Sequence, residues 1–142
     1  MGAATVMMAS GEALPENVVC TLADCGYSSA KEIICKVLGD IKLPAKIFYP
    51  FVRLGGILFG RFDIESNSPE MAMKKAKLPV IFIHGDNDAF VPHYMSEKMY
   101  QACTSEHKKF VTIEKAGHGL AYPIDKEKYL TSLQSFQNEC GF

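Results

Sequence analysis

The chain has 142 residues, of which 48% are hydrophobic and 22% are charged, and its formal net charge is -1. This length suits one domain with a sizeable core, and the composition is ordinary for a globular protein. The near-zero charge gives no electrostatic case for nucleic acid or an anionic membrane surface, so we expect neither as a partner.

Three elements are predicted near the start of the chain. Residues 2–13 are rich in small residues and methionine and indicate a helix pressed close to its neighbours, and residues 17–23 indicate a short buried strand. Ser29 and Glu32 form a capping box that opens a helix over residues 29–38.

The middle of the chain carries residues that interrupt helices. Residues 41–63 contain Pro44, Pro50 and two consecutive glycines, so we expect broken helical segments here and not one rod. Ser68 is a typical N-cap and Pro69 suits the first helical position, which predicts a short helix before the next strand.

The remainder alternates strand and helix. Strands are predicted at 79–84 and 109–114, and helices at 92–103 and 126–140, the last one capped by Asp125. Nearly continuous apolar strands in this order favour a parallel sheet with helices on both faces. Three strands make a small sheet with a long apolar edge. We therefore expect either a truncated piece of a larger fold or pairing with a partner chain, including a second copy.

The longest apolar stretch, residues 47–62, is interrupted by Pro50, Arg53 and Arg61. It is shorter than the roughly 20 residues of a membrane span, so a covering lid is expected instead.

No N-terminal signal pattern is visible, which favours a cytoplasmic protein. The odd number of cysteines, without a CxxC pair, favours buried reduced thiols. They are Cys20, Cys25, Cys35, Cys103 and Cys140.

Two motifs follow the last two predicted strands. The sequence His-Gly-Asp-Asn-Asp-Ala-Phe-Val-Pro at 84–92 places Asp88 in a turn, and Ala-Gly-His-Gly at 116–119 places His118 in a glycine-flanked loop. An acid followed by a histidine gives the last two members of a Ser…Asp…His order. The alternatives are a simple turn aspartate and an ordinary loop histidine. Asp86 is more typical of a turn former than of the catalytic acid.

The other reactive side chains have weaker patterns. His84 is predicted to be structural, whereas His93 and His107 are predicted to lie on the surface. None of the histidines is expected to pair with a carboxylate four residues away, so we expect no metal site, and we expect no cofactor. Cys25 and Cys35 are candidate replacement nucleophiles, but neither lies in a Gly-x-Cys-x-Gly elbow.

The order and spacing of these motifs resemble the C-terminal half of an α/β-hydrolase, in the bacterial serine esterase and peptidase-like branch. That family's acid strand reads H-G-x-x-D-x-x-V-P and its histidine loop reads G-H, which residues 84–92 and 117–119 match. Residues 23–29 resemble the strand end before the family's lid. The resemblance covers essentially the whole chain.

The resemblance implies a partial α/β-hydrolase fold with a parallel sheet, helices on both faces and a helical lid insertion, without the N-terminal strands. The chain would be the C-terminal part of one domain. Residues 1–27 would hold the helix and strand after the nucleophile, residues 28–77 the lid-like segment, and residues 78–142 the acid and histidine strands with their helices.

The resemblance also implies roles for the site residues. His118 would be the general base and then the general acid, and Asp88 would fix its tautomer. Met1-Gly2-Ala3-Ala4 resembles the positions after the nucleophile in G-x-S-x-G, so the Met1 peptide N–H would be an oxyanion donor only in a longer, intact polypeptide. We therefore expect an acyl-enzyme serine hydrolase that is inactive as this chain alone.

The substrate prediction is broad, namely a small-molecule ester or a peptide-like compound. Phe48, Phe51, Leu58 and Phe59 are the predicted substrate-binding residues in the lid, with ordinary core packing as the alternative. The alternative function is a non-catalytic chain of the same fold that pairs with a partner through its open sheet edge.

Overall fold

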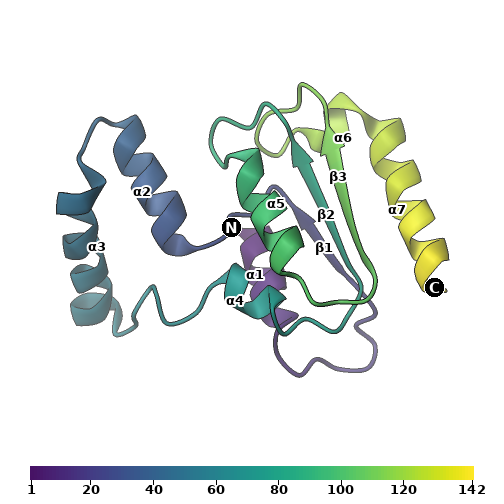
Figure 1. Ribbon diagram of the computed structural model, residues 1–142, viewed down its shortest axis with the longest axis horizontal. Coiled ribbons are helices and arrows are strands. Elements are labelled where there is room, and N and C mark those ends of the chain that lie inside the picture. Colours follow the sequence, from purple (N-terminus) through teal and green to yellow (C-terminus); the bar gives the residue numbers. More distant parts are fainter.

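The computed structural model describes the chain from Met1 to Phe142. Its centre is a parallel sheet of β1 (Thr21–Asp24), β2 (Val80–Gly85) and β3 (Lys108–Ile113) in the order β1-β2-β3. Figure 1 shows α7 on one face of this sheet and α1 and α5 on the other, while α2 and α3 project to one side. The helices are α1 (Gly2–Ala9), α2 (Ala30–Asp40), α3 (Ala45–Gly60), α4 (Pro69–Met73), α5 (His93–Ala102), α6 (Ala121–Ile124) and α7 (Lys126–Cys140).

The central strand β2 is buried along its whole length because both faces of the sheet are covered. Phe82 packs with Met7 of α1 and Met99 of α5, whereas Ile81 and Ile83 belong to the cluster on the α7 side. Successive side chains of a strand point to opposite faces, so a strand covered on both sides must be apolar throughout. The predicted parallel sheet with helices on both faces is confirmed.

The predicted helix caps are present because capping depends on local sequence. Ser29 Oγ accepts the Glu32 backbone N–H at 3.2 Å, Ser68 Oγ accepts that of Met71 at 3.2 Å, and Asp125 Oδ1 accepts that of Lys128 at 2.9 Å. The reciprocal bond of the predicted capping box, from the Ser29 backbone N–H to the Glu32 carboxylate, is absent. The Glu32 carboxylate accepts the Ser28 hydroxyl instead of returning to Ser29.

The prediction of broken helical segments over residues 41–63 is also wrong. Residues Ala45–Gly60 form one helix, α3, with Pro50 inside it. Proline removes one backbone donor, and the remaining turns are held by packing on α2 and by Arg53, whose guanidinium binds both carboxylate oxygens of Asp63 at 2.9 and 2.6 Å. Tertiary and side-chain contacts outweigh the local penalty.

Two further boundaries differ from the prediction. Helix α1 ends at Ala9, and Gly11 after it lies against α4, where a Cβ atom would come within 2.9 Å of the Ala72 Cα. Strand β1 begins only at Thr21. Gly11 thus allows the chain after α1 to lie close against α4.

The pair α2 and α3 lies beside the sheet layers in Figure 1. Tyr49 is the one buried residue of α3. Most of the apolar side chains of this helix face solvent, including Phe51, Leu58 and Phe59. None of the helices combines the length and the apolar character that crossing a bilayer requires. The apolar surface of α3 is thus an exposed face of a two-helix unit.

Candidate active site

The loops that follow the three strands meet at the carboxyl edge of the sheet. Cys25 follows β1, Asp88 follows β2 and His118 follows β3, and one polar atom from each side chain lies within 4.8 Å of the others. Parallel strands end at the same edge, so residues distant in sequence converge there. The edge is the place where chemistry is expected in an open α/β sheet.

The side chain of Asp88 is inaccessible to solvent and fully bonded. Its Oδ1 accepts the backbone N–H groups of Phe90 at 2.9 Å and Val91 at 2.8 Å, while Oδ2 accepts His118 Nδ1–H at 2.8 Å. Two backbone donors fix the carboxylate in one orientation. The other oxygen is thereby aimed at the imidazole.

The ring of His118 is the accessible member of this pair. About a third of its side chain is exposed, and its edge contacts Phe90 with ring centroids 5.1 Å apart. Because the carboxylate is an acceptor, Nδ1 carries the proton and Nε2 is left unprotonated. No other side chain or backbone group of the chain forms a hydrogen bond with this imidazole, so Nε2 is free to accept a proton.

The acid and histidine loops are held together by close backbone contact. A Cβ atom on Gly85 would lie 2.1 Å from the Ala116 carbonyl oxygen, so only glycine permits this approach. The Asn87 N–H donates to the Ala116 carbonyl at 3.1 Å, and Asp86 Oδ1 accepts the Lys115 N–H at 2.6 Å. Asp86 is therefore a loop-bonding residue, as predicted.

His84 bonds to the loop that carries Asp88. Its buried ring places Nε2 2.8 Å from the Val91 carbonyl and 3.2 Å from Asp88 Oδ2, and Nδ1 2.6 Å from Ser96 Oγ. Burial lowers the pKa of His84, so the neutral ring donates from Nε2 and accepts from Ser96 at Nδ1. The expectation that no histidine pairs with a carboxylate four residues away is therefore wrong, both for His84 with Asp88 and for His93, whose Nδ1 lies 3.4 Å from Glu97 Oε1.

Asp24 and Cys25 form a second polar group that the sequence analysis did not assign to the site. Tyr129 Oη donates to Asp24 Oδ2 at 3.1 Å, while the buried Oδ1 has no partner. Burial raises the pKa of Asp24. Burial, and next the charge of Asp24, raises the pKa of Cys25 to about 11. The thiol is protonated at neutral pH, which argues against Cys25 as a replacement nucleophile.

The remaining predicted residues lie elsewhere. Met1 is exposed, and its Sδ accepts Tyr27 Oη–H at 3.7 Å, which places the start of α1 beside the loop after β1. The predicted substrate-binding residues of α3 are exposed, and the structure does not bring them to His118. They are Phe48, Phe51, Leu58 and Phe59.

Two predictions about single residues need correction. His93 is half-buried and not fully exposed, since its Nε2 lies 2.9 Å from Thr112 Oγ1 and its ring packs against Phe110. The cysteines are all free thiols, but only Cys103 is buried. Both errors arise because burial depends on which helix covers which strand, and a single segment of sequence does not specify that.

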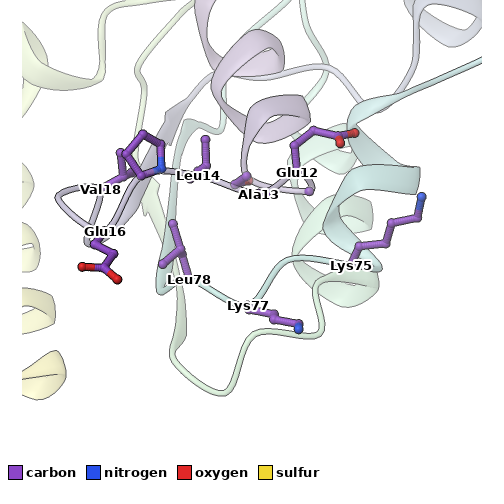
Figure 2. A pocket seen from close by; sticks show the side chains of 11 residues that line it. Glu12, Ala13, Leu14, Glu16, Val18, Lys75, Lys77 and Leu78 are labelled. Carbon is purple, nitrogen blue, oxygen red and sulfur yellow. The ribbon is translucent and has the colours of Figure 1, made fainter.

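A hollow of about 630 Å³ lies away from these residues. Figure 2 shows it between the segment that leads into β1, including Glu12, Leu14 and Glu16, and the segment that leads into β2, including Lys77 and Leu78. It therefore lies at the amino end of the strands, opposite Asp88 and His118. Its position does not connect it with the candidate active site.

Comparisons with known proteins agree with this architecture. Residues 66–125 match the family model described as serine aminopeptidase, S33. The protein YqkD of Bacillus subtilis (strain 168) is 23% identical over 137 residues, which are 96% of this chain and 45% of that protein.

Solved structures of an esterase and a peptidase are similar to this chain over most of its length. The Pyrococcus furiosus esterase Pf2001 has a TM-score of 0.66 at 18% identity and is matched over 100% of this chain and 51% of its own. For the Pyrococcus horikoshii acylaminoacyl peptidase the TM-score is 0.63 at 18% identity, over 96% and 22% of the two chains. The chain therefore spans about half the length of YqkD and of the esterase.

The fold is that of the α/β-hydrolases, and the chain represents part of it. The predicted resemblance to the α/β-hydrolase superfamily is confirmed. Within that class, the segment carrying β2, the acid loop and the histidine loop is the one that matches the serine aminopeptidase (S33) model.

Proposed function

We propose that this chain supplies the acid and the base of a Ser-His-Asp triad in a serine hydrolase that cleaves a carboxylic ester or amide. The observation that carries the proposal is the bond between Asp88 Oδ2 and His118 Nδ1 at 2.8 Å, made by a buried acid and an exposed imidazole. A buried, doubly bonded carboxylate holds the ring in one tautomer. The free Nε2 is the atom that a general base requires.

The reaction would proceed in two steps. His118 Nε2 takes the proton of a serine hydroxyl as its oxygen attacks the carbonyl carbon, and the imidazolium is stabilised by Asp88. The imidazolium then returns the proton to the departing alcohol or amine, which leaves an acyl-enzyme. Water, deprotonated by the same nitrogen, hydrolyses the acyl-enzyme and restores the serine.

The nucleophile in this proposal is contributed by polypeptide outside these residues. No hydroxyl group of the chain forms a hydrogen bond with His118, and Ser96, near the site, is buried against His84. Met1, the residue before α1, contacts Tyr27 in the loop after β1, the same loop that carries Cys25. A peptide N–H at Met1 would then act as an oxyanion donor, and the chain alone would be inactive as a hydrolase.

Labelling with a fluorophosphonate tests the proposal. The coding DNA upstream of Met1 is sequenced first, and the polypeptide of the whole reading frame is then labelled. We expect labelling that is lost in His118→Ala and retained in His107→Ala, a matched change of an exposed histidine away from the site. Equal labelling of the His118→Ala variant would remove His118 from the mechanism.

A second function is favoured by one feature of the sheet. Strand β1 is hydrogen-bonded only to β2, and beside it a groove of about 540 Å³ is lined by Leu22, Leu130 and Leu133 among others. A non-catalytic chain could pair with a partner, including a second copy, along this edge. Sedimentation of a folded dimer that Leu22→Lys converts to a monomer would support this function, and a folded monomer at all concentrations would contradict it.

A further inference from the structure

The convergence of Cys25, Asp88 and His118 brings together three different metal-binding groups. They come from three separate strand ends, and their donor atoms lie within 4.8 Å of one another. Thiolate, imidazole and carboxylate are the protein ligands of zinc, and a set of three leaves a fourth position open to water or substrate. The thiolate separates this site from magnesium and calcium sites, which are built from oxygen.

We propose that Cys25, Asp88 and His118 bind a zinc ion, and that the bound ion blocks His118 as a base. The binding part depends only on the three ligands, whereas the blocking part rests on the proposed function. The two parts are tested by separate measurements.

The geometry needs a small adjustment to hold zinc. Ligand atoms about 2.0 to 2.3 Å from a tetrahedral zinc ion lie about 3.3 to 3.7 Å from one another. Asp88 Oδ2 and His118 Nδ1 are already 2.8 Å apart, so the ion would replace the shared proton or bind beside it. The thiol of Cys25 must approach the other two ligand atoms by about 1 Å. His118 is exposed and gives the ion a path from solvent.

The surroundings favour a cation. Asp24 next to Cys25 has a buried Oδ1 without a partner, and neither Asp24 nor Asp88 is paired with a lysine or arginine. Two carboxylates without a counter-charge are stabilised by a dication, because Coulomb attraction is strong where water is partly excluded. His84 Nε2 lies 3.2 Å from Asp88 Oδ2 and donates to the Val91 carbonyl, so His84 holds the loop that carries this ligand.

A bound zinc ion would prevent His118 from acting as a base, whichever of its ring nitrogens coordinates the ion. If Nε2 binds the ion, its lone pair is occupied. If Nδ1 binds the ion, the proton of the neutral ring moves to Nε2, which then has no lone pair to accept another. Cys25 loses its thiol proton to the buffer, so binding releases one proton and no oxidant or reductant is involved.

Cobalt(II) provides a spectroscopic probe of the site, since it takes the same ligands as zinc and gives a thiolate charge-transfer band. The purified chain is titrated with cobalt chloride and then with zinc chloride, which should displace the cobalt. We expect Cys25→Ser and His118→Asn each to weaken binding on the order of 100-fold. Cys35→Ser, which changes another half-buried thiol, on α2, should leave the affinity unchanged.

The cobalt titration has outcomes that support or overturn the proposed metal site. Loss of the band in Cys25→Ser and its retention in Cys35→Ser support the site, provided that circular dichroism shows both variants folded. If Cys25→Ser does not fold, the His118→Asn titration replaces it. Equal affinity in wild type, Cys25→Ser and His118→Asn, or no cobalt binding by the wild type, overturns the proposal.

Fluorophosphonate labelling of the longer polypeptide with and without zinc separates the two proposals. Cobalt binding without any labelling would support the metal site and contradict the proposed function. Labelling that zinc does not slow, in a protein that binds no cobalt, would support the function and overturn the metal site. Labelling slowed by zinc in wild type but not in Cys25→Ser would support both.

Discussion

The contact between Gly85 and Ala116 makes Gly85→Ala the most direct test of how the loops carrying Asp88 and His118 are held together. The added methyl group would lie 2.1 Å from the Ala116 carbonyl oxygen and 2.6 Å from its carbonyl carbon, both backbone atoms that cannot rotate away. Overpacking of this kind costs about 1 to 3 kcal/mol. Separating the loops also removes the bond from Asn87 N–H to the Ala116 carbonyl, worth about 1 kcal/mol.

We therefore expect Gly85→Ala to lower the free energy of unfolding by about 3 kcal/mol, or the melting temperature by about 6 to 12 °C for a domain of this size. Urea denaturation followed by circular dichroism measures the change. The matched control is Gly39→Ala, because a methyl group on Gly39, near the end of α2, meets nothing within 4 Å.

The control should leave stability unchanged or raise it by up to about 1 kcal/mol, since alanine is the better helix former. The contact also has a consequence for the site, since the displaced histidine loop would carry His118 away from Asp88. The downfield Nδ1–H proton resonance of His118 should weaken or vanish in Gly85→Ala. An unfolding free energy within 0.5 kcal/mol of wild type, together with an unchanged resonance, would refute this account of the loop contact.

Three further predictions follow from the structure. Under the proposed function, Asp88→Asn keeps the shape of the acid but loses its charge, so fluorophosphonate labelling of the polypeptide encoded by the whole reading frame should slow by roughly 10³ to 10⁴-fold. Ser68→Ala removes the cap on the Met71 N–H, and urea denaturation should show a loss of about 1 kcal/mol, whereas unchanged stability would contradict the cap. Because burial raises the pKa of Asp24 in the folded state, its charge destabilises the fold above that pKa, and stability recovers as the pH falls toward the unfolded value. Asp24→Asn should therefore be more stable than wild type at pH 7, with a difference that shrinks toward pH 4, and a difference independent of pH would be the contrary result.

Some residues of the candidate site were predicted from sequence motifs, and others were found only in the structure. Asp88 and His118 were identified from the turn and the glycine-flanked loop that carry them, and the structure bonds them to each other. Asp24 was missed as a site residue, and Cys25 was considered only as a replacement nucleophile, because the sequence does not show that the loop after β1 meets the loops after β2 and β3. His84 was identified as structural, but its contact with Asp88 depends on the return of the chain at Val91.

The sequence by itself determined the features that depend on near neighbours. The caps at Ser29, Ser68 and Asp125 form with the residues three positions later, and the apolar run of β2 requires burial on both faces. Tertiary structure alone decided the continuity of α3 through Pro50 and the meeting of the three strand ends. Capping and alternation are properties of a few consecutive residues, whereas these two depend on packing between segments far apart in the chain, and packing can outweigh local preference.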